Sequence, residues 1–159
     1  MMYILALDPA TNTGWALHYN GRIVAAGVWN LKPKRDSSAG MRAINLRTQL
    51  NTILKTTNGE PLLVAYEVVA RHKGVHAAHC YGGLVSKIQE WCVDNGAEYA
   101  GWPVADIKRF ATGKGNANKQ AMIDAAAKIW NDFGGSDDEA DARFLAMLAA
   151  SELLPREPN

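Results

Sequence analysis

One stretch near the start of the chain decides the fold: YILALDPATNTGWALHYNGRIVAAGVW, residues 3–29. It opens with an apolar run, Tyr3 to Leu7, which has the pattern of a short, fully buried strand. Two more strand-like runs follow, Gly14 to Tyr19 and Arg22 to Trp29, with Asn20-Gly21 between them. This dipeptide is a strong signal for a two-residue type I′ hairpin, because both central residues of that turn need positive φ. The stretch therefore predicts a buried strand followed by an antiparallel hairpin.

Beyond this stretch, helical periodicities alternate with apolar runs. We expect strands over 62–69 and 99–104, helices over 38–56, 77–95, 116–132 and 137–154, and a short helix or turn over 105–113. This order indicates an α/β fold in which helices cover the faces of a mixed sheet. No internal repeat or linker divides the 159 residues, so we expect a single domain.

Composition narrows the class of protein. The chain is 48% hydrophobic and 21% charged, which excludes a disordered chain. Its net charge of +1 argues neither for nor against a nucleic-acid partner. The two cysteines, Cys80 and Cys92, form no disulfide framework. The N-terminus lacks the positively charged start of a signal peptide. No apolar run is long enough to span a bilayer. We expect a cytoplasmic protein.

Two of the apolar strands carry a carboxylate where the pattern predicts core. Asp8 ends the first strand, and Glu67 lies inside LLVAYEVV (62–69), on a face that is otherwise apolar. A buried carboxylate is costly unless it is protonated or finds a cation. Glu67 has two simpler interpretations, pairing with an arginine or a position on an edge strand whose face meets water.

The last helix carries carboxylates in its first two turns. Ser136 and Glu139 have the spacing of a capping box, and acidic groups suit the positive end of a helix. Capping does not account for Asp141, which shares a face with Asp138 and with an apolar stripe further along the helix. That stripe should face the sheet, so Asp138 and Asp141 should point inward.

Together, Asp8, Glu67, Asp138 and Asp141 imply a missing positive partner. A hard divalent cation with oxygen ligands, Mg²⁺ or Mn²⁺, fits best. Zinc fits worse, because the histidines and Cys80 at 72–80 match no zinc spacing. Carboxylates that hold two such ions about 4 Å apart form a site that cleaves phosphodiesters.

The sequence resembles the RuvC-type Holliday-junction resolvases, particularly small phage-encoded members. Four segments carry the resemblance, in family order and spacing: LALDPATNTGWAL (5–17), YEVVARHKGVHAAHCYGGL (66–84), PVADIKRFATGKGNANKQAM (103–122) and DDEADARFLA (137–146). The resemblance implies an RNase H-like fold, with three antiparallel strands followed by parallel ones, and a homodimer that nicks four-way junctions in DNA recombination and repair.

Carried over by position, the resemblance assigns Asp8, Glu67, Asp138 and Asp141 as catalytic metal ligands. It places Lys119 near the scissile phosphate, where a positive charge can stabilise developing negative charge. The cellular members have an aromatic residue just after the strand glutamate, whereas this chain has Val68-Val69-Ala70. Cleavage of other branched DNA, such as forks and flaps, is therefore also expected.

Basic residues near these segments are candidate DNA contacts. They are Arg71 and Lys73, which follow the strand of Glu67, and Lys108, Arg109, Lys114 and Lys119, around a glycine-rich turn. Lysines and backbone N–H groups in such a turn can hold phosphates, although solvated surface lysines are the ordinary alternative. Lys32, Lys34 and Arg35 lie in a predicted loop, where contact with DNA stays open.

Three functions remain to be weighed. The leading one is a Mg²⁺-dependent endonuclease, a crossover junction endodeoxyribonuclease that hydrolyses branched DNA. Actin-like ATPases and sugar kinases also open with a strand aspartate, but they need two such domains, and 159 residues are too few. A non-catalytic protein of the same fold that binds branched DNA is the alternative, against which the four carboxylates argue, since acidic groups repel phosphates.

Overall fold

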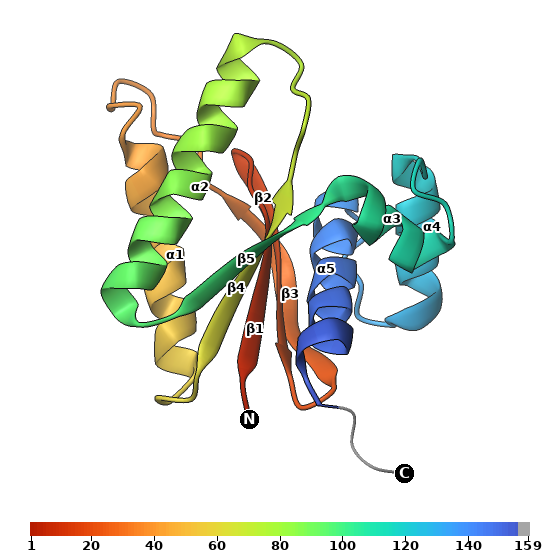
Figure 1. The fold of residues 1–159 in the computed structure, drawn as a ribbon. Helices are drawn as coiled ribbons and strands as arrows, with labels where there is room; N and C mark the ends of the chain where they lie inside the picture. The colour runs from red at the N-terminus through yellow and green to blue at the C-terminus, as the bar shows by residue number, and fades with distance from the viewer. Residues whose placement is uncertain (156–159) are drawn as a thin grey trace.

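The computed structural model describes residues 1–155, which form a five-stranded mixed sheet flanked by helices (Figure 1). The strands are β1 (Tyr3–Asp8), β2 (Asn12–Tyr19), β3 (Arg22–Asn30), β4 (Leu62–Val68) and β5 (Glu98–Pro103). The helices are α1 (Met41–Thr56), α2 (Val75–Asn95), α3 (Val104–Thr112), α4 (Lys119–Ile129) and α5 (Asp137–Leu153).

The strand order is β3-β2-β1-β4-β5. The first three strands pair antiparallel, and β4 and β5 are added in parallel to β1. Asn20 and Gly21 close the hairpin with φ of 53° and 80°, as a type I′ turn requires. The predicted mixed sheet of three antiparallel and then parallel strands is confirmed.

Helices cover both faces of the sheet, as Figure 1 shows. α1 and α2 lie over one face, where they bury a core that contains Leu5, Leu7 and Val64. α5 lies against the other face, flanked by α3 and α4, over a core that contains Ile4 and Ala6. Side chains alternate between the two cores along β1, because successive residues of a strand point to opposite faces. β1 is therefore the central, fully covered strand.

Several helix boundaries differ from the prediction. The helix expected from residue 38 begins at Met41, because the Ser38 hydroxyl accepts from the Gly40 N–H within a turn and leaves the helix end uncapped. The helix expected over 116–132 is shorter. It begins after Asn118, whose side chain caps the Ala121 N–H, and it ends at Ile129.

Within residues 1–155, no helix has both the length and the apolar character needed to cross a membrane.

Candidate metal centre

Asp8 and Glu67 lie side by side because their strands are parallel neighbours. Leu7 is aligned with Tyr66 across the β1–β4 pair, so Asp8 at the end of β1 and Glu67, one residue before the end of β4, lie at the same edge of the sheet. By strand alternation, both share the face that packs against α5. Glu67 is buried, with 7% of its surface exposed. The parallel pairing therefore brings together two residues that are far apart in sequence.

The start of α5 lies against this edge. Gly14 of β2 is aligned with Asp8, and a Cβ atom at Gly14 would stand 1.9 Å from the backbone oxygen of Asp138. Only a glycine permits so close an approach of helix and strand. Carboxylate oxygens of Asp8, Glu67 and Asp141 lie within 4.8 Å of one another. Asp138 lies one turn before Asp141, close enough to Asp8 for its negative charge to raise the pKa of Asp8.

Each of these four carboxyl groups has a raised pKa. Burial is the largest cause for every one, because it disfavours the charged form. For Asp8, the negative charges of Glu67 and Asp138 raise the pKa further, to well above its ordinary value. For Asp141, burial and the neighbouring aspartates raise the pKa to about 7. The cluster therefore resists carrying its full negative charge when no cation is bound.

The cluster fits a hard divalent cation. All its donors are carboxylate oxygens, the ligands that Mg²⁺ and Mn²⁺ prefer. In the part of the chain that the structure describes, Asp141 Oδ1 is buried and has no hydrogen-bond partner. None of the four carboxylates forms an ion pair with a lysine or arginine of residues 1–155, so the arginine-paired interpretation of Glu67 is wrong. Glu67 also lies on a strand with neighbours on both sides, which excludes the edge-strand interpretation.

Two lysines border the cluster on the side of α3 and α4. Lys108 is half-buried in α3, and its charge partly offsets the raised pKa values of Glu67 and Asp141. Lys119 begins α4, and its Nζ lies 3.4 Å from Asp137 Oδ2. Its charge also lowers the pKa of Asp138. Lys108 was expected only as a DNA contact, and no role at the site was expected for Asp137. The structure brings both to the border of the cluster.

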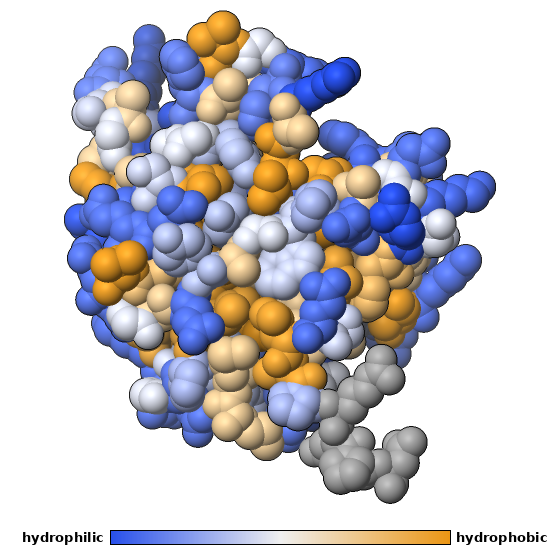
Figure 2. Space-filling view, in the orientation of Figure 1, coloured by the Kyte–Doolittle hydropathy of each residue, from blue (hydrophilic) through white to orange (hydrophobic). Residues whose placement is uncertain are grey.

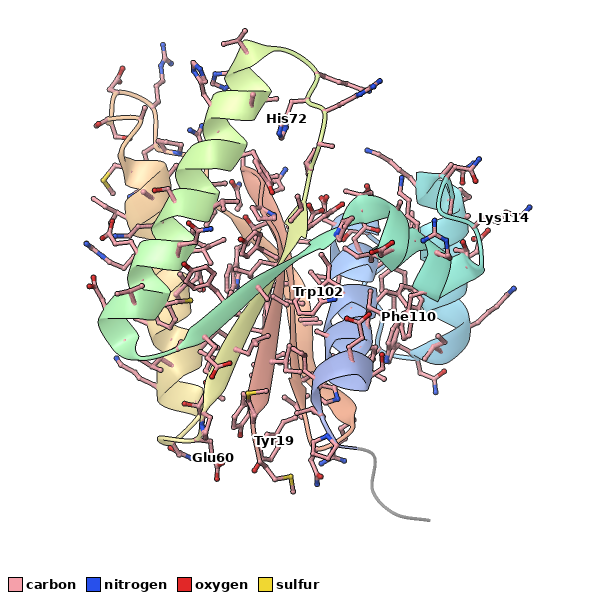
Figure 3. All side chains as sticks on the ribbon, viewed as in Figure 1. Tyr19, Glu60, His72, Trp102, Phe110 and Lys114 are labelled. Atoms are coloured by element: carbon pink, nitrogen blue, oxygen red, sulfur yellow. The ribbon has the colours of Figure 1, made fainter. Side chains whose placement is uncertain are left out.

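The other basic candidates lie further out on the surface. Arg71 and Lys73 are exposed on the loop after β4, and Lys114 is exposed between α3 and α4. Figure 3 shows His72 on the loop that leads to α2, above the sheet, and Lys114 at the far right, beside α3 and α4. Arg109 is less available for contact with DNA, because it forms an ion pair with Asp106 at 3.0 Å.

A hollow of about 380 Å³ opens beside Asp8, between residues 9–11 and the start of α2. The rings of His72 and Tyr81 line it with their centroids 4.8 Å apart. The Tyr81 hydroxyl donates to the Glu67 carbonyl oxygen at 2.8 Å and accepts from the Val69 N–H at 3.3 Å. Tyr81 is therefore fixed to the strand that carries Glu67. A larger cavity of about 820 Å³, near Tyr19 at the other end of the sheet, contains none of the four carboxylates.

The histidines and cysteines do not form a second metal centre. His72, His76 and Cys80 all line the hollow. Across residues 1–155, however, the one group of three potential ligands with atoms within 4.8 Å of one another is Asp8, Glu67 and Asp141.

A buried arginine fixes the start of α5. Arg143 is 2% exposed, and its Nε donates to Glu139 Oε2 at 2.9 Å, while its Nη1 donates to Asp132 Oδ1 at 3.2 Å. The Ser136 hydroxyl caps the helix as predicted, but the Glu139 carboxylate accepts from Arg143 and from the Gly134 N–H. In a capping box, the Glu139 side chain would instead accept a hydrogen bond from the Ser136 backbone N–H. The spacing of Glu139 and Arg143, four residues apart, is the signal that could have revealed the pair.

Comparison with solved structures identifies the fold. A structure titled "T. thermophilus RuvC in complex with Holliday junction substrate" matches with a TM-score of 0.75 and 18% sequence identity, covering 94% of this chain and 93% of that one. A second, "Thermus thermophilus RuvC structure", matches with a TM-score of 0.68 and 16% identity, covering 96% of each chain. No family model matches the chain, and no curated protein matches it at a significant level. The expected RNase H-like fold of the RuvC structures is confirmed.

Proposed function

We propose that this protein is a metal-dependent endonuclease that hydrolyses phosphodiester bonds in four-way junctions and in other branched DNA. The observation that carries the proposal is the convergence of Asp8, Glu67 and Asp141 within 4.8 Å of one another. Their burial and raised pKa values indicate a pocket that needs a cation. The likeness to a RuvC structure that contains a Holliday junction supports branched DNA as the substrate.

In this proposal, the carboxylates of Asp8, Glu67, Asp138 and Asp141 hold Mg²⁺ or Mn²⁺, two ions in each active site. Bound ions of this kind lower the pKa of an attacking water and stabilise charge on the leaving oxygen. Lys119 stands at the border of the pocket, where its ammonium group can stabilise the negative charge that develops on the phosphate. Lys108 places a second positive charge at the same border, near Glu67 and Asp141.

The outer basic residues would bind the DNA backbone. Arg71 and Lys73 are exposed on the loop between β4 and α2, and Lys108, Arg109, Lys114 and Lys119 lie on α3, on α4 and between them. Contacts of this kind position a duplex without reading its sequence. We further propose that the chain is a single nuclease domain and acts as a homodimer in the cytoplasm, in DNA recombination and repair, because two copies would nick two strands of one junction.

A labelled four-way junction tests the proposal. The protein should make paired, symmetric nicks with Mg²⁺ or Mn²⁺ and none with a chelator. Glu67→Gln should bind the junction without cutting it, whereas Asp94→Asn, which changes an exposed aspartate on α2, should cut normally. Binding without cleavage in any divalent metal would instead identify a non-catalytic junction-binding protein. Forks, flaps and linear duplex in the same assay define the substrate range.

A further inference from the structure

The loop after β3 leaves the sheet at the same edge as the candidate metal centre. β3 runs antiparallel to β2, which runs antiparallel to β1, so the ends of β3 and β1 lie at one edge. The Leu31 N–H donates to the Thr11 carbonyl oxygen at 2.7 Å, which ties this loop to the turn that follows Asp8. Neighbouring strands are about 4.8 Å apart, so β3 ends roughly 10 Å from the carboxylate edge of β1.

This segment carries a concentration of positive charge. Lys32, Lys34, Arg35 and Arg42 occur within residues 31–42, against one acidic residue, Asp36. The whole chain has a net charge of only +1, so the charge is strongly localised. Lys32, Lys34 and Arg35 are all exposed, and hydrophilic atoms cover the upper left of the molecule, where the loop lies (Figures 1 and 2). We call these four basic residues the β3–α1 basic surface.

Within the described residues, the β3–α1 basic surface forms no ion pair with an acidic group. Among the ion pairs of residues 1–155, none includes Lys32, Lys34, Arg35 or Arg42. The Nε of Arg42 is moreover a buried donor without a hydrogen-bond partner in that same range. Other exposed basic residues of the described range, such as Lys114 and Lys128, are also unpaired, so the clustering of four cations within residues 31–42 is what distinguishes this segment. A set of unpaired cations at one edge is the electrostatic footprint of a polyanion.

This surface lies at the same edge of the sheet as the candidate metal centre, which points to DNA as the polyanion. Figure 1 shows the β3–α1 loop on the side of α1 and α2, whereas α3 and α4 lie on the other side of the sheet that carries the metal centre. An extended chain of phosphates could contact cations on both sides of the cleavage site. We propose that the β3–α1 basic surface binds the phosphate backbone of a second segment of the branched DNA, away from the bond that is cut. This inference rests on the proposed function, and it extends the surface that contacts the DNA to the loop after β3.

Salt-dependent DNA binding tests the inference. In a Glu67→Gln background, which keeps the junction uncut, the triple variant Lys32→Ala/Lys34→Ala/Arg35→Ala should bind a labelled junction roughly tenfold more weakly at physiological salt. The slope of log affinity against log salt should become shallower by about 2 to 3, since each lost phosphate contact removes about 0.9. The matched control is Arg22→Ala/Lys55→Ala/Lys128→Ala, which removes the same charge from exposed positions on other parts of the surface. Its affinity should change less than about twofold.

The outcomes separate this inference from the proposed function. Equal losses in the two triple variants would mean that only net charge matters, and unchanged affinity in the first would mean that the surface does not contact DNA. Either result overturns the inference, while nicking by the wild-type protein would still support the nuclease. If the wild-type protein neither binds nor cuts branched DNA, both proposals are wrong.

Discussion

Asp141 occupies a helical position where its side chain is partly buried, with Oδ1 fully buried, near other carboxylates. Burial is the main reason why its pKa rises to about 7, and Asp8, Asp137 and Asp138 add to the effect. A charged Asp141 therefore destabilises the folded protein whenever no cation is bound. A bound divalent ion relieves this repulsion. Asp141 therefore lowers the stability of the ion-free protein and raises its affinity for the ion.

Asp141→Asn should raise the free energy of unfolding at pH 8, in the absence of divalent ions, by on the order of 1–3 kcal/mol. The amide keeps the shape of the side chain and removes the buried charge. Urea denaturation in a chelator measures the change. The exposed Asp94→Asn should change stability by less than about 0.5 kcal/mol. A loss of stability in Asp141→Asn would contradict this account.

The raised pKa values also predict a pH dependence. The folded protein binds protons at Asp8, Glu67, Asp138 and Asp141 more tightly than the unfolded chain does. Their stabilising effect is complete below the ordinary pKa of 3.8 for aspartate and is lost as the pH rises through the folded value, about 7 for Asp141. Without divalent ions, the unfolding free energy should therefore fall between about pH 4 and pH 7.

Mg²⁺ should stabilise the protein more at pH 8 than at pH 5, because it binds the deprotonated cluster and competes with protons. Denaturation curves at the two pH values, with Mg²⁺ and with a chelator, measure the difference. An equal effect of Mg²⁺ at both pH values would show that the ion binds elsewhere.

At the scale of the elements, the close packing of α5 against β2 requires a glycine at position 14. Gly14→Ala would put a Cβ atom 1.9 Å from the Asp138 backbone oxygen, so the helix must shift away from the strand. We expect a loss of about 2 kcal/mol or more in stability, as for other overpacked sites, and weaker Mn²⁺ binding. Calorimetric titration with Mn²⁺ measures the second effect.

Gly82→Ala is the matched control for Gly14. Gly82 lies inside α2, where an added Cβ meets nothing within 4 Å. Alanine is the better helix former, so this variant should gain about 0.5–1 kcal/mol and bind Mn²⁺ as the wild type does. Normal stability and Mn²⁺ affinity in Gly14→Ala would show that the contact with α5 does not position the ligands.

Arg143 holds the first turns of α5 to the preceding turn. Arg143→Met should cost about 3–5 kcal/mol, because it leaves the buried Glu139 carboxylate without its cation. Arg109→Met removes an exposed pair with Asp106 and should cost less than about 1 kcal/mol. Equal losses in the two variants, measured by urea denaturation, would contradict the structural role assigned to Arg143.

Local patterns predicted most of these elements. The apolar runs and Asn20-Gly21 predicted the sheet, because strand burial and the turn depend on adjacent residues. Helix starts were less predictable, since Ser38 and Asn118 are equally good caps by composition and only Asn118 caps a helix. The Arg143 cluster was missed, because its partner Asp132 belongs to a turn whose path the sequence pattern does not define.

For the whole molecule, the topology assembles the site. Parallel pairing of β1 with β4 joins Asp8 to Glu67, and packing of α5 against the same face adds Asp138 and Asp141. The sequence drew attention to Asp8, Glu67 and Asp141 because each carboxylate interrupted an apolar pattern, and to Asp138 because it shares a helix face with Asp141. The lysines at the border gave no such signal, since a lysine on a helix is ordinary. Their place near the pocket depends on how α3 and α4 pack beside α5.

The central claim is that the four carboxylates bind divalent ions together. A crystal soaked in Mn²⁺ and measured for anomalous scattering tests it directly. We predict a strong anomalous peak within coordination distance of Asp8, Glu67 and Asp141, and its loss in crystals of Glu67→Gln. A fully soaked crystal with no peak there, or with Mn²⁺ bound only at other sites, would contradict the claim.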